Sequence, residues 1–128
     1  MKLLLDTHIW LWLYREPERI GARLMRELRS GEHELWLSPV SIWEALLLFG
    51  KNKLKIQADP NTWVNEAAGR FLEAPLTTEI VITSFGLELH PDPADRFLAA
   101  TAKVLGLTLV TADQRLLGLG EIATLANR

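Results

Sequence analysis

Short apolar runs alternate along the chain with longer segments in which apolar residues recur every three or four positions. The short runs predict strands at residues 2–5, 34–37, 75–77, 107–110 and 122–125. The longer segments predict helices at residues 7–14, 17–29, 39–50, 61–72, 78–87 and 93–105, with one helical turn at 114–117. Because strands that alternate with helices form parallel sheets covered on both faces, we expect a three-layer α/β/α sandwich. Its central sheet should be mostly parallel and have four to five strands.

The chain has 128 residues, enough for one domain (1–128) whose core needs neither disulfides nor a structural metal. Cysteine is absent, which excludes a disulfide framework, a cysteine zinc site and a thiol nucleophile. No apolar run approaches the ~20 residues of a membrane span, and the N-terminal run is too short for a signal peptide. We therefore expect a soluble, cytoplasmic protein with no membrane partner.

The net charge of −2 counts against a general nucleic-acid binder, which usually carries an excess of Lys and Arg. The same charge is compatible with a nuclease whose acids hold a divalent cation. The cation then supplies the positive charge that faces the phosphate.

Two aspartates follow predicted strands. Asp6 comes directly after the first strand, and Asp113 lies just beyond the strand at 107–110. Each is also placed to cap the helix that follows it, and for either residue alone capping is the simpler interpretation.

Two further acids lie on apolar helix faces. Glu44 shares a face with Val40, Leu47 and Leu48, where an unpaired carboxylate is costly to bury. Asp95 shares a face with residues 98, 99 and 102, although it could instead complete a capping box that begins at Asp92. An edge position or a salt bridge is the structural alternative for Glu44.

In a parallel α/β sheet all four positions lie at one edge, beyond the carboxyl ends of the strands. Carboxylates gathered there repel one another unless a cation joins them, and oxygen ligands favour Mg²⁺, with Mn²⁺ as a substitute. We expect Asp6, Asp95 and Asp113 to bind the metal, directly or through water. Glu44 would ligate a second ion or orient the attacking water. Thr111 would orient one of the acids.

Four segments in this order resemble the PIN-domain family, and within it the VapC toxins of type II toxin–antitoxin modules. They are residues 3–8 (LLLDTH), 41–44 (SIWE), 90–96 (HPDPADR) and 109–113 (LVTAD). The resemblance implies a Mg²⁺-dependent endoribonuclease with its acid quartet at Asp6, Glu44, Asp95 and Asp113. It also implies a homodimer, a VapB-type antitoxin that blocks the site, and structured RNA such as tRNA or rRNA as substrate. Ala94 and Pro91 depart from the family's usual residues, which puts the choice of substrate in question.

The residues near Asp6 disfavour two other functions of small α/β proteins with acidic sites. A receiver-type phosphoacceptor needs an acid pair after the first strand and a late lysine, and neither is present. A haloacid-dehalogenase-type phosphatase needs a second Asp where His8 stands. A catalytically degenerate module that binds RNA or a protein partner stays open, as does a DNA-cutting or nonspecific nuclease.

Several other side chains have competing interpretations. Asp92 is chiefly a helix cap, with a metal role as the alternative. Arg96 and Lys51 are candidate substrate contacts, Arg96 beside Asp95 and Lys51 in the basic run 51–55, although each could be merely structural or solvated. The three histidines show no metal-binding spacing, and the five tryptophans lie among aliphatic residues that favour core or dimer packing over base stacking.

Overall fold

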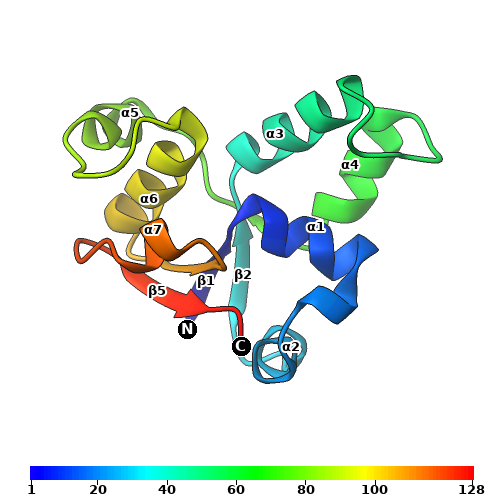
Figure 1. Cartoon of the computed structure of the whole chain (residues 1–128), viewed down its shortest axis with the longest axis horizontal. Helices are drawn as coiled ribbons and strands as arrows, with labels where there is room; N and C mark the ends of the chain where they lie inside the picture. Colours follow the sequence, from blue (N-terminus) through cyan, green and yellow to red (C-terminus); the bar gives the residue numbers. More distant parts are fainter.

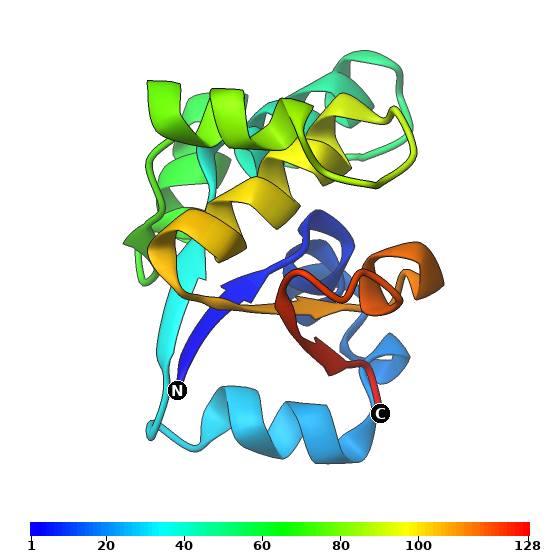
Figure 2. The ribbon, with the colours of Figure 1, turned by 90° about the vertical axis from the view of Figure 1, so that its left-hand side faces the viewer.

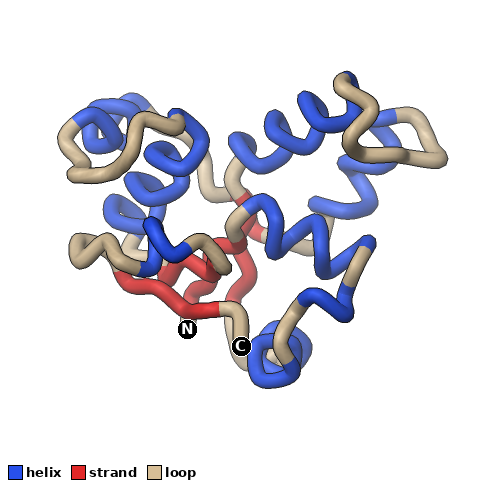
Figure 3. The backbone as a smooth tube through the Cα atoms, viewed as in Figure 1, coloured by secondary structure: helices blue, strands red, loops and turns tan.

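The computed structural model describes all 128 residues and contains one five-stranded sheet in the order β3-β2-β1-β4-β5. Every neighbouring pair of strands is parallel, as the alternating pattern predicts. The strands are β1 (Lys2–Leu5), β2 (Glu34–Leu37), β3 (Leu72–Glu73), β4 (Thr108–Thr111) and β5 (Ala123–Ala126). Figure 3 shows the strands at the centre of the molecule with helices around them.

Seven α-helices and one 3-10 turn surround this sheet (Figure 1). They are α1 (Thr7–Arg15), the 3-10 turn η1 (Pro17–Arg19), α2 (Ala22–Arg29), α3 (Pro39–Gly50), α4 (Pro60–Ala68), α5 (Thr78–Phe85), α6 (Pro93–Leu105) and α7 (Gln114–Leu117). None of these helices has both the length and the apolar character needed to cross a membrane.

Alternate residues of β1 face two separate cores. Leu3 and Leu5 pack with side chains from α1, α2 and α4, whereas Leu4 packs with side chains from α5, α6 and α7. Successive side chains of a strand point to opposite faces, so a run of consecutive leucines in a strand needs cover on both sides. The helices therefore form two layers around the sheet, which confirms the expected α/β/α sandwich.

The prediction of a single helix at 17–29 is wrong. Ile20 and Gly21 are extended and separate η1 from α2. A Cβ built on Gly21 would lie 1.9 Å from the carbonyl carbon of Arg128, so only glycine allows this close approach. The backbone N–H of Leu24 donates to the Arg128 carbonyl at 2.8 Å, which ties the start of α2 to the end of β5.

The third strand is also displaced from its expected place at 75–77. Helix α4 ends at Ala68, and β3 follows it, pairing Leu72 with Trp36 of β2. Pro75 has no N–H to donate, so the ladder stops before the segment where the pattern placed a strand. The helix expected at 61–72 ends four residues early, because Leu72 belongs to β3. The remaining differences are shifts of one or two residues at element ends.

Strand order determines where a ligand can bind. The chain moves from β1 to β2 and β3 in one direction, then returns to place β4 and β5 on the other side of β1. Parallel sheets bind ligands beyond the strand ends at such a reversal, here between β1 and β4. Asp6 and Asp113 follow these two strands.

Candidate active site

Asp6 combines a capping role with burial at the reversal point. Asp6 is only 7% exposed. Its carboxylate accepts hydrogen bonds from the Thr7 backbone N–H and the Thr111 hydroxyl, both at 2.7 Å. Thr111 also accepts from the Asp113 backbone N–H at 3.0 Å. Thr111 therefore orients Asp6 and joins the ends of β1 and β4.

Glu44 reaches the same point from α3. The helix begins at Ser38, whose hydroxyl accepts from the Val40 N–H at 3.0 Å, and Glu44 follows in its second turn. The Thr7 hydroxyl donates to the Glu44 carboxylate and lies 2.8 Å from the Ser41 hydroxyl. Glu44 is half-buried and held by a polar contact to α1 instead of an ion pair.

Asp95 lies in the first turn of α6 and is oriented by a histidine. His90 Nε2 lies 2.7 Å from Asp95 Oδ2, and both side chains are largely buried. The other ring nitrogen of His90 is buried without a hydrogen-bond partner. The sequence analysis assigned His90 no role. Its place two residues before the N-cap Asp92, beside the first turn of α6, was the signal that could have revealed this contact.

Asp113 caps α7 and is paired with a second residue that the sequence analysis missed. The Arg115 guanidinium lies 3.3 Å and 3.1 Å from the two Asp113 oxygens. The same guanidinium reaches to 3.9 Å from Asp95 Oδ2. Arg115 is thus an exposed cation that links Asp95 and Asp113.

Burial and mutual repulsion shape the electrostatics of the acids. Burial raises the pKa of Asp6, and the nearby Asp95 charge raises it further against the opposing Thr111 hydrogen bond. Burial likewise raises the pKa of Glu44, to which the charges of Asp6 and Asp95 add. Burial raises the pKa of Asp95 as well, with Asp92 and Asp113 adding repulsion. Hydrogen bonding from Arg115 instead lowers the pKa of Asp113.

Shared contacts bring the predicted residues together in pairs. Thr7 donates to Asp6 through its backbone N–H and to Glu44 through its hydroxyl. Arg115 joins Asp113 to Asp95. The charge of Asp95 also acts on Asp6 and Glu44. Buried carboxylates that disfavour each other's ionised forms are suited to a hard divalent cation with oxygen ligands. The donor set therefore fits the divalent metal expected from the sequence.

Asp92 is held as a cap. Its carboxylate accepts from the backbone N–H groups of Ala94 and Asp95, at 3.0 Å and 3.4 Å. Ligand atoms of His90, Asp92 and Asp95 also lie within 4.8 Å of one another, so this trio could add ligands at the exposed side of the cluster.

Arg96 is a structural residue instead of the substrate contact suggested by its place beside Asp95. Its guanidinium donates to five backbone carbonyls, those of Ser84, Phe85, Leu87, Leu89 and His90. A guanidinium has five N–H donors, so this set leaves none for RNA. The bonds fix the loop between α5 and α6 that carries His90. Lys51 is exposed at the C-cap of α3 and has no contact with the acids.

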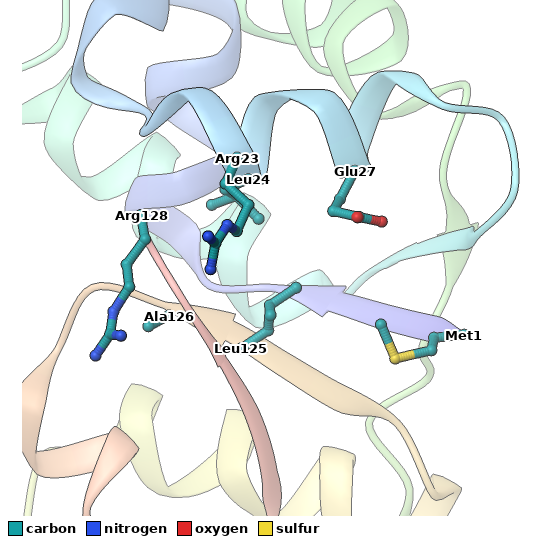
Figure 4. Close-up of a pocket in the computed structure, with 7 residues that line it drawn as sticks. All are labelled: Met1, Arg23, Leu24, Glu27, Leu125, Ala126 and Arg128. Carbon is teal, nitrogen blue, oxygen red and sulfur yellow. The ribbon is translucent and has the colours of Figure 1, made fainter.

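A separate cavity of about 300 Å³ lies between α2 and the sheet (Figure 4). It lies between α2 and β5, close to Met1 at the start of β1, and is lined by Met1, Arg23, Leu24, Glu27, Leu125, Ala126 and Arg128. None of the four acids lines it, so it is distinct from the candidate active site.

The chain is similar to known proteins in sequence and in fold. The chain is 28% identical over 116 residues to Ribonuclease VapC22 of Mycobacterium tuberculosis (strain ATCC 25618 / H37Rv), covering 89% of this chain and 88% of that protein. Its fold is similar to that of a chain of VapBC2 from Rickettsia felis bound to a promoter DNA fragment, with a TM-score of 0.74, 16% identity and 98% of each chain covered. A chain of a toxin–antitoxin complex from Klebsiella pneumoniae is similar as well, with a TM-score of 0.70, 18% identity and 98% of each chain covered.

Residues 3–122 match the family described as PIN domain, a span that includes all four acids and every strand but the last. The expected resemblance is therefore confirmed over nearly the whole chain, and the protein belongs to the PIN domain family.

Proposed function

We propose that this protein is a Mg²⁺-dependent endoribonuclease, the toxin of a toxin–antitoxin pair, which hydrolyses phosphodiester bonds of structured RNA such as tRNA or rRNA. The observation that carries the proposal is the cluster of buried and half-buried carboxylates that hydrogen bonds and Arg115 hold at the reversal point of the sheet. Similarity to a protein named as a ribonuclease supports RNA as the substrate. Such a toxin would act on RNA in the cytoplasm.

Asp6, Glu44, Asp95 and Asp113 would hold the metal, directly or through water. A Mg²⁺ ion bound by carboxylates lowers the pKa of a water molecule and neutralises charge that develops on a phosphate. The chain's own contribution is orientation: a hydroxyl or an imidazole fixes three of these carboxylates before RNA arrives. Preorganised ligands of this kind reduce the reorganisation needed in the transition state.

Two residues have further assigned roles. Glu44, whose pKa is raised by burial, is suited to accept a proton from the attacking water. Arg115 carries an exposed guanidinium next to Asp95 and Asp113, and a planar fork of N–H donors matches the oxygens of a phosphate. Hydrolysis by water attack on phosphorus would leave a 3′-hydroxyl and a 5′-phosphate.

Purified protein incubated with total cellular RNA tests the proposal. Discrete fragments with 5′-phosphate ends are expected in Mg²⁺ or Mn²⁺, and EDTA should abolish them. The protein must first be shown by mass spectrometry to be free of co-purified partner. If partner-free protein cuts no RNA with either ion, the proposal is overturned in favour of a degenerate module that binds RNA or protein. Equal cutting of DNA would overturn the assignment of RNA as the substrate.

An antitoxin of the VapB type is the proposed protein partner. Support comes from the similar structures, which are a VapBC pair bound to promoter DNA and a toxin–antitoxin complex. A gene for a small DNA-binding protein directly upstream would identify the candidate. Its product should form a complex with this chain and block cleavage, and failure to do both would exclude it.

A homodimer is the proposed oligomeric state. Large apolar side chains are exposed on α3 and α5, two helices that both contact α6. Phe85 is 89% exposed, Ile82 69% and Trp43 51%. Ile82 and Phe85 lie one helical turn apart on α5, and monomeric proteins rarely leave neighbouring large apolar side chains in water. These helices are therefore the proposed contact between two copies.

Phe85→Glu is expected to convert the protein to a monomer, because it places a charge on the most exposed of these apolar side chains. Size-exclusion chromatography with light scattering measures the mass directly. Phe85→Leu keeps an apolar side chain at the same position and should retain the dimer. A dimeric Phe85→Glu protein would show that the contact lies elsewhere.

A further inference from the structure

A groove of about 550 Å³ opens beside the candidate active site, between α1 and the loop that follows α3. Eleven residues line it: His8, Leu11, Trp12, Arg15, Glu16, Arg19, Leu48, Asn52, Lys53, Leu54 and Lys55. It adjoins the acids through His8, because the preceding residue, Thr7, donates a hydrogen bond to Glu44.

One wall of the groove is a face of α1. His8, Trp12 and Arg15 are spaced by four and three residues, so they project from the same side of the helix. With a rise of about 1.5 Å per residue, this stripe runs roughly 10 Å away from the acids. Arg19 of η1 then places its guanidinium 5.0 Å from the centre of the Trp12 ring.

The other wall is a loop held in a defined position. Leu54 is buried in the core, whereas Lys53 and Lys55 on either side of it are exposed. The Lys53 N–H donates to the Leu48 carbonyl at 2.9 Å, and Asn52 makes the reversal at a positive φ of 57°. The two lysines are thus presented to the groove from an anchored backbone.

The charge of the groove opposes that of the whole protein. Four Lys and Arg side chains and His8 line it, against the single acid Glu16, although the protein carries a net charge of −2. Glu16 is itself paired with Arg19 at 3.3 Å. The other basic side chains of the groove have no ion-pair partner; these are His8, Arg15, Lys53 and Lys55. The groove therefore carries an unneutralised positive field next to a site built from acids.

We propose that this groove binds the single-stranded flank of the RNA substrate, with its basic side chains on successive phosphates and a base stacked at Trp12. The inference rests on the proposed function and adds to it the path of the substrate. Stacking on an aromatic ring or on a guanidinium plane beside phosphate-binding cations is a usual mode of single-strand binding. Basic side chains on the flank offset the repulsion that the acids would exert on a polyanion.

An acidic protein segment is the competing ligand for a basic groove. The aromatic and guanidinium surface at Trp12 and Arg19, and the direct connection to the acids through His8, favour a nucleotide chain. The two ligands are separated in the experiment by testing a glutamate-rich peptide in parallel.

The test is the binding of a fluorescent, single-stranded RNA of mixed sequence, measured by anisotropy in EDTA over a series of KCl concentrations. Lys53→Gln/Lys55→Gln should weaken binding about tenfold and reduce the slope of log affinity against log salt by about 1.4, since two phosphate contacts are lost. Lys2→Gln/Arg26→Gln is the charge-matched control. It removes two exposed cations at the opposite end of the sheet, where α2 and the N-terminus lie (Figure 2), and should bind within about twofold of the unchanged protein.

Trp12→Leu gives an independent readout. It should weaken RNA binding about tenfold through lost stacking while leaving the salt slope unchanged. Thermal melting is measured for each variant, and because both groove lysines are exposed, the lysine variant stays interpretable if Trp12→Leu fails to fold.

The outcomes separate this inference from the proposed function. Equal RNA binding by the lysine and control variants would overturn the inference. It would also be overturned if the lysine variant lost binding of the glutamate-rich peptide but bound RNA as the unchanged protein does. Cleavage of total cellular RNA in Mg²⁺ is measured separately. Groove-dependent binding without cleavage would support the inference and overturn the proposed function. Cleavage with groove-independent binding would overturn the inference alone.

Discussion

Asp6→Asn is expected to reduce RNA cleavage by about 10³-fold or more while raising the melting temperature of the metal-free protein. Cleavage is lost because the substitution removes one of the proposed metal-binding charges. The fold is retained because an amide fits the same contacts. Its oxygen can accept from the Thr7 N–H, and its nitrogen can donate to the Thr111 hydroxyl.

The gain in stability follows from the cost of the buried charge. Burial raises the pKa of Asp6, and the charge of Asp95 adds to it, so the ionised carboxylate is less favourable in the folded state than in the unfolded chain. A neutral amide avoids this cost. An increase of a few degrees, measured by differential scanning fluorimetry in EDTA at pH 7, is the expected size.

Asp59→Asn is the matched control for Asp6→Asn. Asp59 also caps a helix, accepting from the Thr62 N–H at 3.1 Å, but it is exposed, and the Thr62 hydrogen bonds lower its pKa. The same substitution there should leave cleavage unchanged and should not raise the melting temperature. If Asp6→Asn were instead to unfold the protein, the role of Asp6 would be capping and packing, as its place after the first strand also allows.

Addition of Mg²⁺ or Mn²⁺ is the second change with a large expected effect. A ligand that binds only the folded state at a concentration of 100 times its Kd adds about 2.7 kcal/mol to the free energy of unfolding. For a chain of this size that corresponds to a rise in melting temperature on the order of 10 °C. Glu44→Gln removes a proposed ligand and should lose much of the rise. An equal rise in that variant would exclude Glu44 from the metal site.

The sign of the pH dependence follows from the same carboxyls. Burial raises the pKa of Asp6, Glu44 and Asp95 in the folded state. Between the ordinary and the raised pKa values, the folded state therefore binds more protons than the unfolded chain. The stability of the metal-free protein should therefore fall as pH rises through the interval between the ordinary and the raised pKa values. Asp113 acts in the opposite sense, because Arg115 lowers its pKa and its contribution is lost only as pH falls. Metal, which binds the ionised acids, should offset the fall above that interval.

The sequence by itself determined the local structure and the identity of the candidate acids. Residues 3–5 are consecutive leucines, which predicts a strand covered on both faces, and the structure contains the strand at the expected bounds 2–5. The proline and aspartate at the start of α6 and the left-handed Gly106 at its end were readable because capping depends on residues close in sequence. Asp6, Asp95 and Asp113 could be named because each stands next to such a local boundary, and Glu44 because it lies on an otherwise apolar helix face.

Only the tertiary structure decided what these acids contact. Thr111 meets Asp6 across 105 positions and Thr7 meets Glu44 across 37, and no local periodicity encodes pairs so far apart. The positions of β3 and of the break at Gly21 depend in the same way on distant backbone, namely β2 and Arg128. Arg96 and Arg115 look equivalent in the sequence, each one or two residues after an acid. In the folded protein Arg96 binds backbone carbonyls, whereas Arg115 contacts the acids. The elements packed around each side chain determine which partners it meets.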